Sequence, residues 1–184
     1  MPDYTVALVS FGAKSTERLR YILGRLNVTC RVLFPDETPS FHYTHIILSG
    51  GPKHVYEADT YTMPEWVLQS TAPVLGVCYG MQLIAHTFGG RVTKMSHVEK
   101  GPVEVTEMIK GEQLTSLRWM NRLDQVVSIP DAFTITGVTS SNHIASFTDH
   151  HRWWAVQYHP EASKHGDASV LRRFLRLVRT DTVS

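Results

Sequence analysis

A cysteine that follows a strand-like segment is the residue best placed for covalent chemistry. Cys78 lies at the centre of residues 76–80 (GVCYG), after the apolar stretch 73–75 and before the helix-like stretch 81–86. Small residues two positions before and after a nucleophile, between strand and helix, are typical of a nucleophile elbow, whose tight turn exposes the reactive side chain. A helix that begins there also favours the thiolate. The alternative is a buried core cysteine, the usual environment of a free thiol.

A histidine at the end of another strand-like segment is the second candidate. His159 is followed by Pro160 and Glu161. The proline restricts His159 to an extended conformation, in which the side chains of His159 and Glu161 can project to the same side. A carboxylate there can orient the imidazole and stabilise its protonated form, as the third member of a catalytic triad does. The alternative for a lone histidine is a structural role.

Paired glycines close a third strand-like segment. Gly50 and Gly51 lie between Ser49 and Pro52, directly after the apolar residues 45–48. Backbone N–H groups at such glycines can face a small ligand, as an oxyanion hole requires. An ordinary Gly-Pro turn is the alternative. Because ligands bind beyond the carboxyl ends of the strands in an open α/β sheet, the agreement among these three positions favours a single site.

The elements that must position these residues alternate between strands and helices in the first half of the chain. Apolar runs predict strands over 5–9, 31–34 and 45–48, and a fourth that ends at Cys78. Helical spacing predicts helices over 15–26, with Ser15 as a candidate N-cap, and over 64–69. Buried strands that alternate with amphipathic helices indicate an α/β fold, doubly wound, with a mostly parallel central sheet covered by helices on both faces.

The second half of the chain has a different pattern. Short strands divided by turns are predicted over 103–106, 125–129, 133–138 and 144–147, which suggests a small antiparallel layer, and a further strand over 153–158 leads into His159. The last predicted element is an amphipathic helix over 167–179. No linker or internal repeat divides the chain, so residues 1–184 are interpreted as one domain.

Composition limits the classes of function. The apolar share is 42%, the charged share 19% and the net charge +1, so neither a nucleic acid nor a membrane surface is expected as a partner. No signal peptide and no bilayer-spanning run is apparent. The two cysteines, Cys30 and Cys78, cannot form a disulfide framework, which favours a reducing, cytoplasmic environment. Ten histidines are scattered, and no metal site is predicted.

Three segments together resemble the class I (triad) glutamine amidotransferases. They are residues 76–82 (GVCYGMQ), 49–52 (SGGP) and 157–161 (QYHPE), and the likeness continues through 55–57, 89–90 and 100–105. Within that family the sequence is most similar to the amidotransferase part of GMP synthases, which carry this form of the oxyanion segment and of the elbow. The resemblance covers nearly the whole chain in the family's order and implies a flavodoxin-like fold.

The resemblance also implies a role for each matching residue. Cys78 would attack the side-chain amide of glutamine, His159 would act as base and then protonate the departing ammonia, and Glu161 would hold the imidazole. The backbone N–H groups of Gly51 and Tyr79 would form the oxyanion hole. Two further positions, Gly50 and Gln82, would line or hold the substrate. The product of the first half-reaction would be a γ-glutamyl thioester that water hydrolyses to glutamate.

One segment departs from the family pattern. GMP synthases carry a tryptophan-methionine-serine-histidine-glycine-aspartate run at the glutamine site, where this chain has residues 119–124 (WMNRLD). The middle three residues, Asn121, Arg122 and Leu123, are candidate substrate contacts. Replacement of glycine by Leu123 is expected to change the backbone, while Arg122 offers a charge contact to the carboxylate of glutamine.

The resemblance further implies a partner. The chain has no P-loop-like segment, so ammonia released here would be delivered to an ATP-dependent synthetase subunit or domain that converts XMP to GMP. The amidotransferase step would need no cofactor, and ATP and magnesium would belong to the synthetase. Two alternatives stay open: a hydrolase of other γ-glutamyl compounds on the same scaffold, and a catalytically idle relative that binds a partner.

Overall fold

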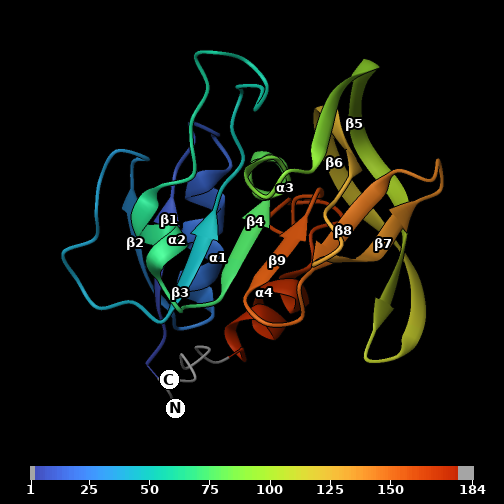
Figure 1. Ribbon diagram of the computed structural model, residues 1–184. Coiled ribbons are helices and arrows are strands. Elements are labelled where there is room, and N and C mark those ends of the chain that lie inside the picture. Colours follow the sequence, from blue (N-terminus) through green and yellow to red (C-terminus); the bar gives the residue numbers. More distant parts are fainter. Residues whose placement is uncertain (1–2, 178–184) are drawn as a thin grey trace.

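Apolar runs of four or five residues form the centre of one nine-stranded sheet (Figure 1). The computed structural model describes residues 3–177. The parallel part of the sheet consists of β1 (Thr5–Val9), β2 (Thr29–Leu33), β3 (His45–Leu48), β4 (Val74–Val77) and β9 (Trp153–Val156). Residues of β3 and β4 are buried throughout, as expected for strands covered on both faces.

The strand order is β2-β1-β3-β4-β9-β8-β7-β5-β6. The antiparallel strands are β5 (Arg91–Ile109), β6 (Glu112–Ser128), β7 (Thr134–Thr139) and β8 (Ile144–Thr148). They do not make a separate layer, because β8 pairs antiparallel with β9 and the sheet continues without a break. The predicted α/β class with a parallel centre and helices on both faces is confirmed, and the antiparallel part extends the same sheet.

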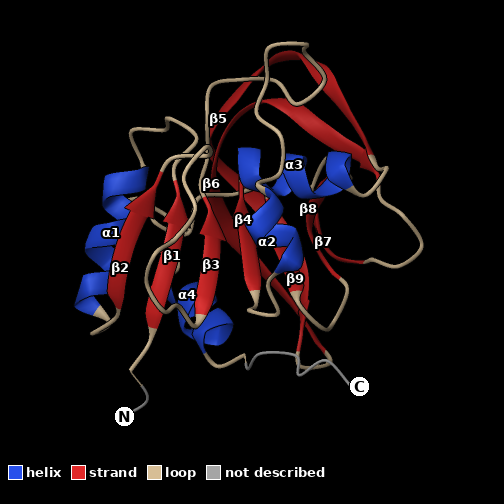
Figure 2. Ribbon diagram, turned by 60° about the vertical axis from the view of Figure 1, so that its left-hand side comes forward, coloured by secondary structure: helices blue, strands red, loops and turns tan. Residues whose placement is uncertain are grey.

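Four helices among residues 3–177 cover the two faces of the sheet (Figure 2). They are α1 (Thr16–Arg25), α2 (Glu65–Gln69), α3 (Tyr79–Thr87) and α4 (Ala168–Leu175). The apolar residues of α1 and α4 share one core cluster with Val6, Leu8 and Ile47. Those of α2 and α3 share the other cluster, on the opposite face, with Ile46 and Leu48. Successive side chains of one strand therefore pack alternately into the two core clusters.

The structure differs from the predicted elements mainly in the second half. The segments predicted as short strands at 103–106 and 125–129 belong to one long hairpin, in which β5 and β6 pair from Arg91↔Ser128 to Ile109↔Glu112. The final helix ends at Leu175 rather than at Arg179, and residues 178 and 179 lie outside the described part of the chain. No helix within residues 3–177 is both long and apolar enough to cross a bilayer.

Parallel pairing places several loops at one edge of the sheet. The carboxyl ends of β1, β3, β4 and β9 lie side by side, because these strands are neighbours and run in the same direction. The residues that follow these strands (10–12, 49–52, 78 and 157–161) are therefore brought together.

Candidate functional site

The turn between β4 and α3 holds Cys78 in a strained conformation. Its φ is 53° and its ψ is −105°, which is rare for a residue with a side chain and costs on the order of 1–3 kcal/mol. The turn closes tightly, since a Cβ atom on Gly76 would lie 2.6 Å from the carbonyl oxygen of Gly80. A side chain on Gly80 would likewise collide with the carbonyl of Leu48. These contacts explain the small residues on both sides of the cysteine.

Backbone hydrogen bonds fix this turn to the neighbouring strands. The N–H of Cys78 donates to the carbonyl of Val156 over 2.9 Å, and that of Gly80 donates to the carbonyl of Ser49 over 3.1 Å. The elbow is therefore tied both to the strand that precedes His159 and to the loop that carries Gly50 and Gly51.

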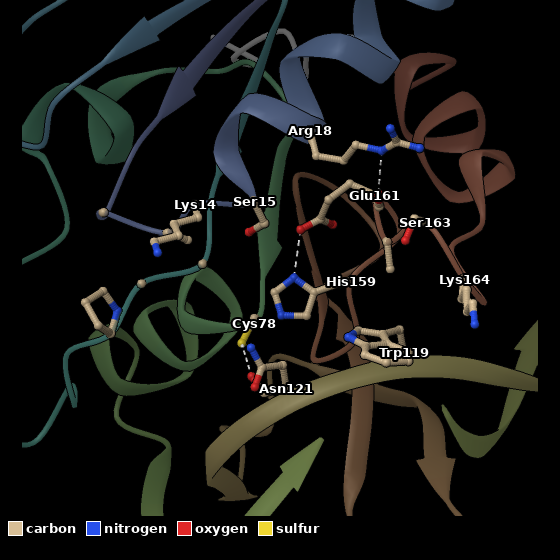
Figure 3. Close-up of a pocket in the computed structure, with 16 residues that line it drawn as sticks. Lys14, Ser15, Arg18, Cys78, Trp119, Asn121, His159, Glu161, Ser163 and Lys164 are labelled. Carbon is tan, nitrogen blue, oxygen red and sulfur yellow. Dashed lines mark hydrogen bonds and ion pairs between the residues drawn. The ribbon is translucent and has the colours of Figure 1, made fainter. Parts of the chain in front are cut away.

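A histidine and a glutamate form a buried pair next to the cysteine. His159 Nδ1 lies 2.7 Å from Oε1 of Glu161, and the two residues are 8% and 1% exposed. The N–H of His159 donates to the carbonyl of Trp119 over 2.9 Å, which ties the loop after β9 to β6. Figure 3 shows the imidazole between the Glu161 carboxylate and the Cys78 sulfur. The order carboxylate, imidazole, thiol is the one that a triad requires.

The electrostatic environment of His159 favours the imidazolium. Burial alone would lower the pKa of His159, but its interactions with Cys78 and Glu161 raise that pKa to about 10. His159 therefore holds its proton at neutral pH. Its Nε2 atom is buried and has no hydrogen-bond partner among the described residues apart from the facing thiol. A proton at this atom is available to a group bound beside the sulfur.

A cavity of about 700 Å³ opens in front of the thiol. It is enclosed by the loops after β1, β3 and β9 together with β6. Its lining includes Gly50, Gly51, Cys78, Asn121, His159 and Glu161. The Cys78 thiol also contacts the cavity wall directly, because Sγ lies 3.6 Å from the backbone carbonyl oxygen of Asn121.

Of the two predicted oxyanion donors, Tyr79 directly follows the cysteine and Gly51 belongs to the loop after β3. Tyr79 is the first residue of α3, so its N–H has no carbonyl to bond within the helix. Neither this N–H nor that of Gly51 donates a hydrogen bond to another described residue. At Gly51 a side chain would meet the carbonyl oxygen of Phe11 at 2.6 Å, so only glycine allows this backbone to pack here. Gly50 is also close, since a Cβ atom there would touch His159 and Cys78.

The predicted substrate contact Gln82 is turned into the protein. Its side-chain amide donates to the carbonyl of Asp124 over 3.5 Å and to Oε1 of Gln157 over 3.3 Å. The residue is 4% exposed and does not line the cavity. In this conformation it joins the first turn of α3 to β6 and to the residue that follows β9.

The Asn121, Arg122 and Leu123 segment is an extended part of β6, so its side chains alternate between two faces. Asn121 lines the cavity, and Leu123, which faces the same way, does not reach it. The Arg122 guanidinium lies on the opposite face, fully buried, with its Nε 2.7 Å from Oε2 of Glu99 and its Nη2 3.1 Å from Nδ1 of His143. The expected charge contact between Arg122 and a substrate in the cavity is therefore not found.

Asp124 ties β6 to the loop after the paired glycines. Its Oδ2 lies 2.6 Å from Nδ1 of His54, and its Oδ1 accepts a hydrogen bond from the Tyr56 hydroxyl over 2.9 Å. The rings of His54 and Tyr56 stack, with 5.4 Å between their centroids. This cluster holds the loop that carries Gly51 against the strand that carries Asn121.

Several residues of the cavity wall were not predicted from the sequence to line the site. They are Lys14, Ser15 and Arg18 at the start of α1, Trp119 on β6, and Ser163 and Lys164 after Glu161. Their positions follow from the rule that loops after parallel strands meet at one edge, because α1 starts in the loop after β1. Within residues 3–177 no group of three or more His, Cys, Asp or Glu side chains is arranged to hold a metal ion.

Comparisons with known proteins agree with this architecture. Residues 7–178 match the family described as glutamine amidotransferase class-I. A GMP synthase [glutamine-hydrolyzing] from Histophilus somni is 34% identical in an alignment 177 positions long, which covers 87% of this chain and 34% of that protein. One from Thermomicrobium roseum is 35% identical in an alignment 182 positions long, which covers 93% of this chain and 34% of that protein. The chain thus spans about a third of the length of these curated relatives.

Two solved structures have the same fold. A Thermoplasma acidophilum protein, provisionally named as one of the subunits of a GMP synthase, superimposes with a TM-score of 0.82 and 25% identity, over 95% of this chain and 94% of that one. A glutamine amidotransferase from Thermotoga maritima does so with a TM-score of 0.69 and 20% identity, over 95% and 82% of the two chains. Together with the match over residues 7–178, these findings show that the chain belongs to the class I glutamine amidotransferase family.

Proposed function

We propose that this amidotransferase hydrolyses glutamine through Cys78, His159 and Glu161 and supplies the ammonia to an ATP-dependent synthetase that aminates XMP to GMP. The observation that carries the first part is the arrangement at the sheet edge. Cys78, in a strained turn, faces the imidazole of His159, and Nδ1 of that imidazole lies 2.7 Å from the buried carboxylate of Glu161. Such an arrangement activates a thiol for attack on an unreactive amide.

The first half-reaction forms a thioester. The Cys78 thiolate attacks the amide carbon of glutamine, and the oxyanion that develops accepts hydrogen bonds from the N–H groups of Gly51 and Tyr79. His159, which carries a proton at neutral pH, passes it to the amide nitrogen. The carbon–nitrogen bond breaks, ammonia leaves, and a γ-glutamyl group remains on the sulfur.

The second half-reaction releases glutamate. The neutral His159 now takes a proton from water, whose oxygen attacks the thioester carbon in the same oxyanion hole. When the carbon–sulfur bond breaks, glutamate leaves and the starting thiolate and imidazolium are restored. Glu161 keeps the imidazole oriented in both steps by holding Nδ1.

The proposed partner rests on the relatives. The two curated relatives described above are named GMP synthase [glutamine-hydrolyzing], and the chain matches about a third of their length. The remainder of the reaction, with its ATP and magnesium, is assigned in this proposal to a synthetase subunit or domain, so the amidotransferase step uses no cofactor. A candidate exit for ammonia is the cavity that opens in front of Cys78.

An assay for the release of glutamate and ammonia from glutamine tests this function. The purified chain is assayed alone, and then together with the synthetase part of a GMP synthase, ATP, magnesium and XMP. We expect Cys78→Ala to abolish release, and Cys30→Ala to leave it unchanged. Cys30 is the matched control because burial raises the pKa of its thiol to about 12, which makes it unreactive at neutral pH. Unchanged release by Cys78→Ala would refute the nucleophile assignment.

The same assay separates the alternatives. Glutamate release from γ-glutamyl peptides but not from glutamine, with or without the synthetase, would favour a hydrolase of other γ-glutamyl compounds. Absence of any release, together with binding to the synthetase, would favour an idle partner-binding relative. Glutamine-dependent formation of GMP only when both proteins are present would support the proposed partner.

A further inference from the structure

We propose that Ser15 is a positioning residue that holds the Glu161 carboxylate through a bridging water. The inference rests on the proposed roles of Cys78, His159 and Glu161. It adds to the proposed triad a residue at the start of α1. No motif and no spacing in the sequence indicated a chemical role for that helix.

The first observation is an unpaired oxygen on Glu161. Oε1 of this carboxylate is taken by His159 Nδ1, whereas Oε2 is buried and has no hydrogen-bond partner among the described residues. Glu161 as a whole is 1% exposed, so bulk water does not solvate Oε2. A buried carboxylate oxygen without a donor is costly and leaves the carboxylate free to rotate away from the imidazole.

The second observation is an unused hydroxyl on Ser15. The residue occupies the N-cap position of α1, yet its side chain makes no capping hydrogen bond. Its Oγ is buried and, within the described residues, has no partner. The usual reason for a serine at this position, a hydrogen bond to the first turn of the helix, is therefore absent.

The two residues that carry these unpaired groups lie at the same cavity. Ser15 and Glu161 both line the cavity in front of Cys78. In Figure 3 Ser15 lies beside the Glu161 carboxylate, at the start of α1. The atoms do not form a direct hydrogen bond, and a polar gap of this kind is commonly closed by one water that bonds to both groups.

The start of α1 already contacts Glu161 in a second way. The Nε atom of Arg18, one turn after Ser15, donates to the backbone carbonyl of Glu161 over 3.3 Å. The positive end of the helix dipole also favours a carboxylate at this place. The first turn of α1 therefore fixes the backbone of Glu161 through Arg18, and Ser15 fixes its carboxylate.

A double-mutant cycle between Ser15 and Glu161 tests the proposal. The variants are Ser15→Ala, Glu161→Ala and both together, each in a Cys30→Ala background. Two quantities are measured: the kcat and KM of glutamine hydrolysis, and the rate constant for alkylation of Cys78 by iodoacetamide, which needs no glutamine. Ser15→Gly serves as a second variant because glycine is tolerated at an N-cap. Ser15→Thr keeps the hydroxyl, and Ser141→Ala, in an exposed turn, is the control.

We expect Ser15→Ala and Ser15→Gly to lower kcat and the alkylation rate by about 10- to 150-fold, the effect of losing one hydrogen bond to a charged group. KM should not change, and Ser15→Thr should restore most of the rate. In the Glu161→Ala background the Ser15 substitution should have no further effect, since the carboxylate it holds is gone.

Full additivity of the two substitutions, or rates equal to those of Ser141→Ala, would overturn the proposal. Failure of the proposed function would appear differently. In that case the protein would not hydrolyse glutamine, but the alkylation rate of Cys78 would still depend on Ser15, and only when Glu161 is present. This result would refute the glutaminase assignment and support the positioning role of Ser15.

Discussion

Arg122 and Glu99 face each other across the β5–β6 hairpin, with 2.7 Å between the guanidinium Nε and the carboxylate Oε2. The Arg122 side chain is fully buried and that of Glu99 is 17% exposed. The pair lies on the face of β6 opposite to Asn121, so it fixes which side chains of this segment turn toward the cavity. A residue that the family resemblance placed at the glutamine site thus serves the packing of the hairpin.

Removal of the charge of Glu99 should destabilise the protein. Glu99→Gln leaves the Arg122 guanidinium buried without its counter-ion, and we expect the free energy of unfolding to fall by about 3 kcal/mol, measured by urea denaturation. Glu17→Gln is the matched control, because the Arg20–Glu17 pair is exposed and is worth less than about 1 kcal/mol. Equal effects of the two substitutions would contradict the structural role of the buried pair.

Substitution of Arg122 itself should not weaken glutamine binding. Because its guanidinium does not reach the cavity, Arg122→Met is expected to leave the KM for glutamine within about twofold of the wild-type value, in a protein that remains folded. A tenfold or larger rise in KM in a folded Arg122→Met variant would show that the arginine contacts the substrate.

The residues of β6 show why the packing of this segment could not be predicted from the sequence. The inward positions of the strand are Arg118, Met120, Arg122, Asp124 and Val126, three of which are charged. The alternation of apolar and polar residues that usually marks a half-buried strand is therefore hidden. The inward charged residues are held instead by partners on other segments, such as Glu107 for Arg118 and His54 for Asp124. Only the tertiary contacts reveal that Arg122 is an inward residue.

The sheet edge was easier to predict. Cys78, His159 and Gly51 each follow an apolar run, and the rule that ligands bind beyond the carboxyl ends of parallel strands needs only the strand ends, not their order. Ser15 could be placed at the start of a helix from its spacing. That its hydroxyl makes no cap and that it lies beside Glu161 depend on how the start of α1 meets the loop after β9, which no local pattern reports.

Neutralisation of Glu161 should impair turnover rather than binding. Glu161→Gln keeps the shape of the side chain but removes the charge that helps to raise the pKa of His159. We expect kcat to fall by about 10²- to 10⁴-fold with little change in KM, and the pKa of His159, followed by NMR, to move from about 10 toward its ordinary value. A normal kcat in this variant would remove Glu161 from the proposed mechanism.

A side chain at Gly51 should damage the oxyanion hole. A Cβ atom there would lie 2.6 Å from the carbonyl oxygen of Phe11, so Gly51→Ala must shift the N–H that is proposed to bind the oxyanion. We expect kcat to fall by about 10²- to 10³-fold. Gly24→Ala, in the exposed part of α1 with no atom within 4 Å of the new methyl, should leave kcat unchanged and stabilise the protein by about 0.5–1 kcal/mol. Similar kinetics for the two variants would argue against the oxyanion role.

Acid should weaken the start of α4. Burial alone would raise the pKa of the Asp167 carboxyl, but hydrogen bonds from Ser169 and Arg118 hold it below its ordinary value. A carboxyl whose pKa is lower in the folded state stabilises the protein above its unfolded pKa, and this contribution is lost as the pH falls through the folded pKa. The difference in unfolding free energy between wild type and Asp167→Asn should therefore be greatest near pH 7 and shrink below about pH 4. A constant difference between pH 7 and pH 3 would contradict this.

Formation of a covalent γ-glutamyl intermediate on the Cys78 thiol is the step on which the whole mechanism depends. Acid quenching of the enzyme during turnover of radiolabelled glutamine, followed by isolation of the labelled peptide, tests it most directly. We predict label on the peptide that contains Cys78, none on the peptide that contains Cys30, and none in Cys78→Ala. Continued ammonia release by Cys78→Ala, or turnover in the wild type with label on any residue other than Cys78, would contradict it.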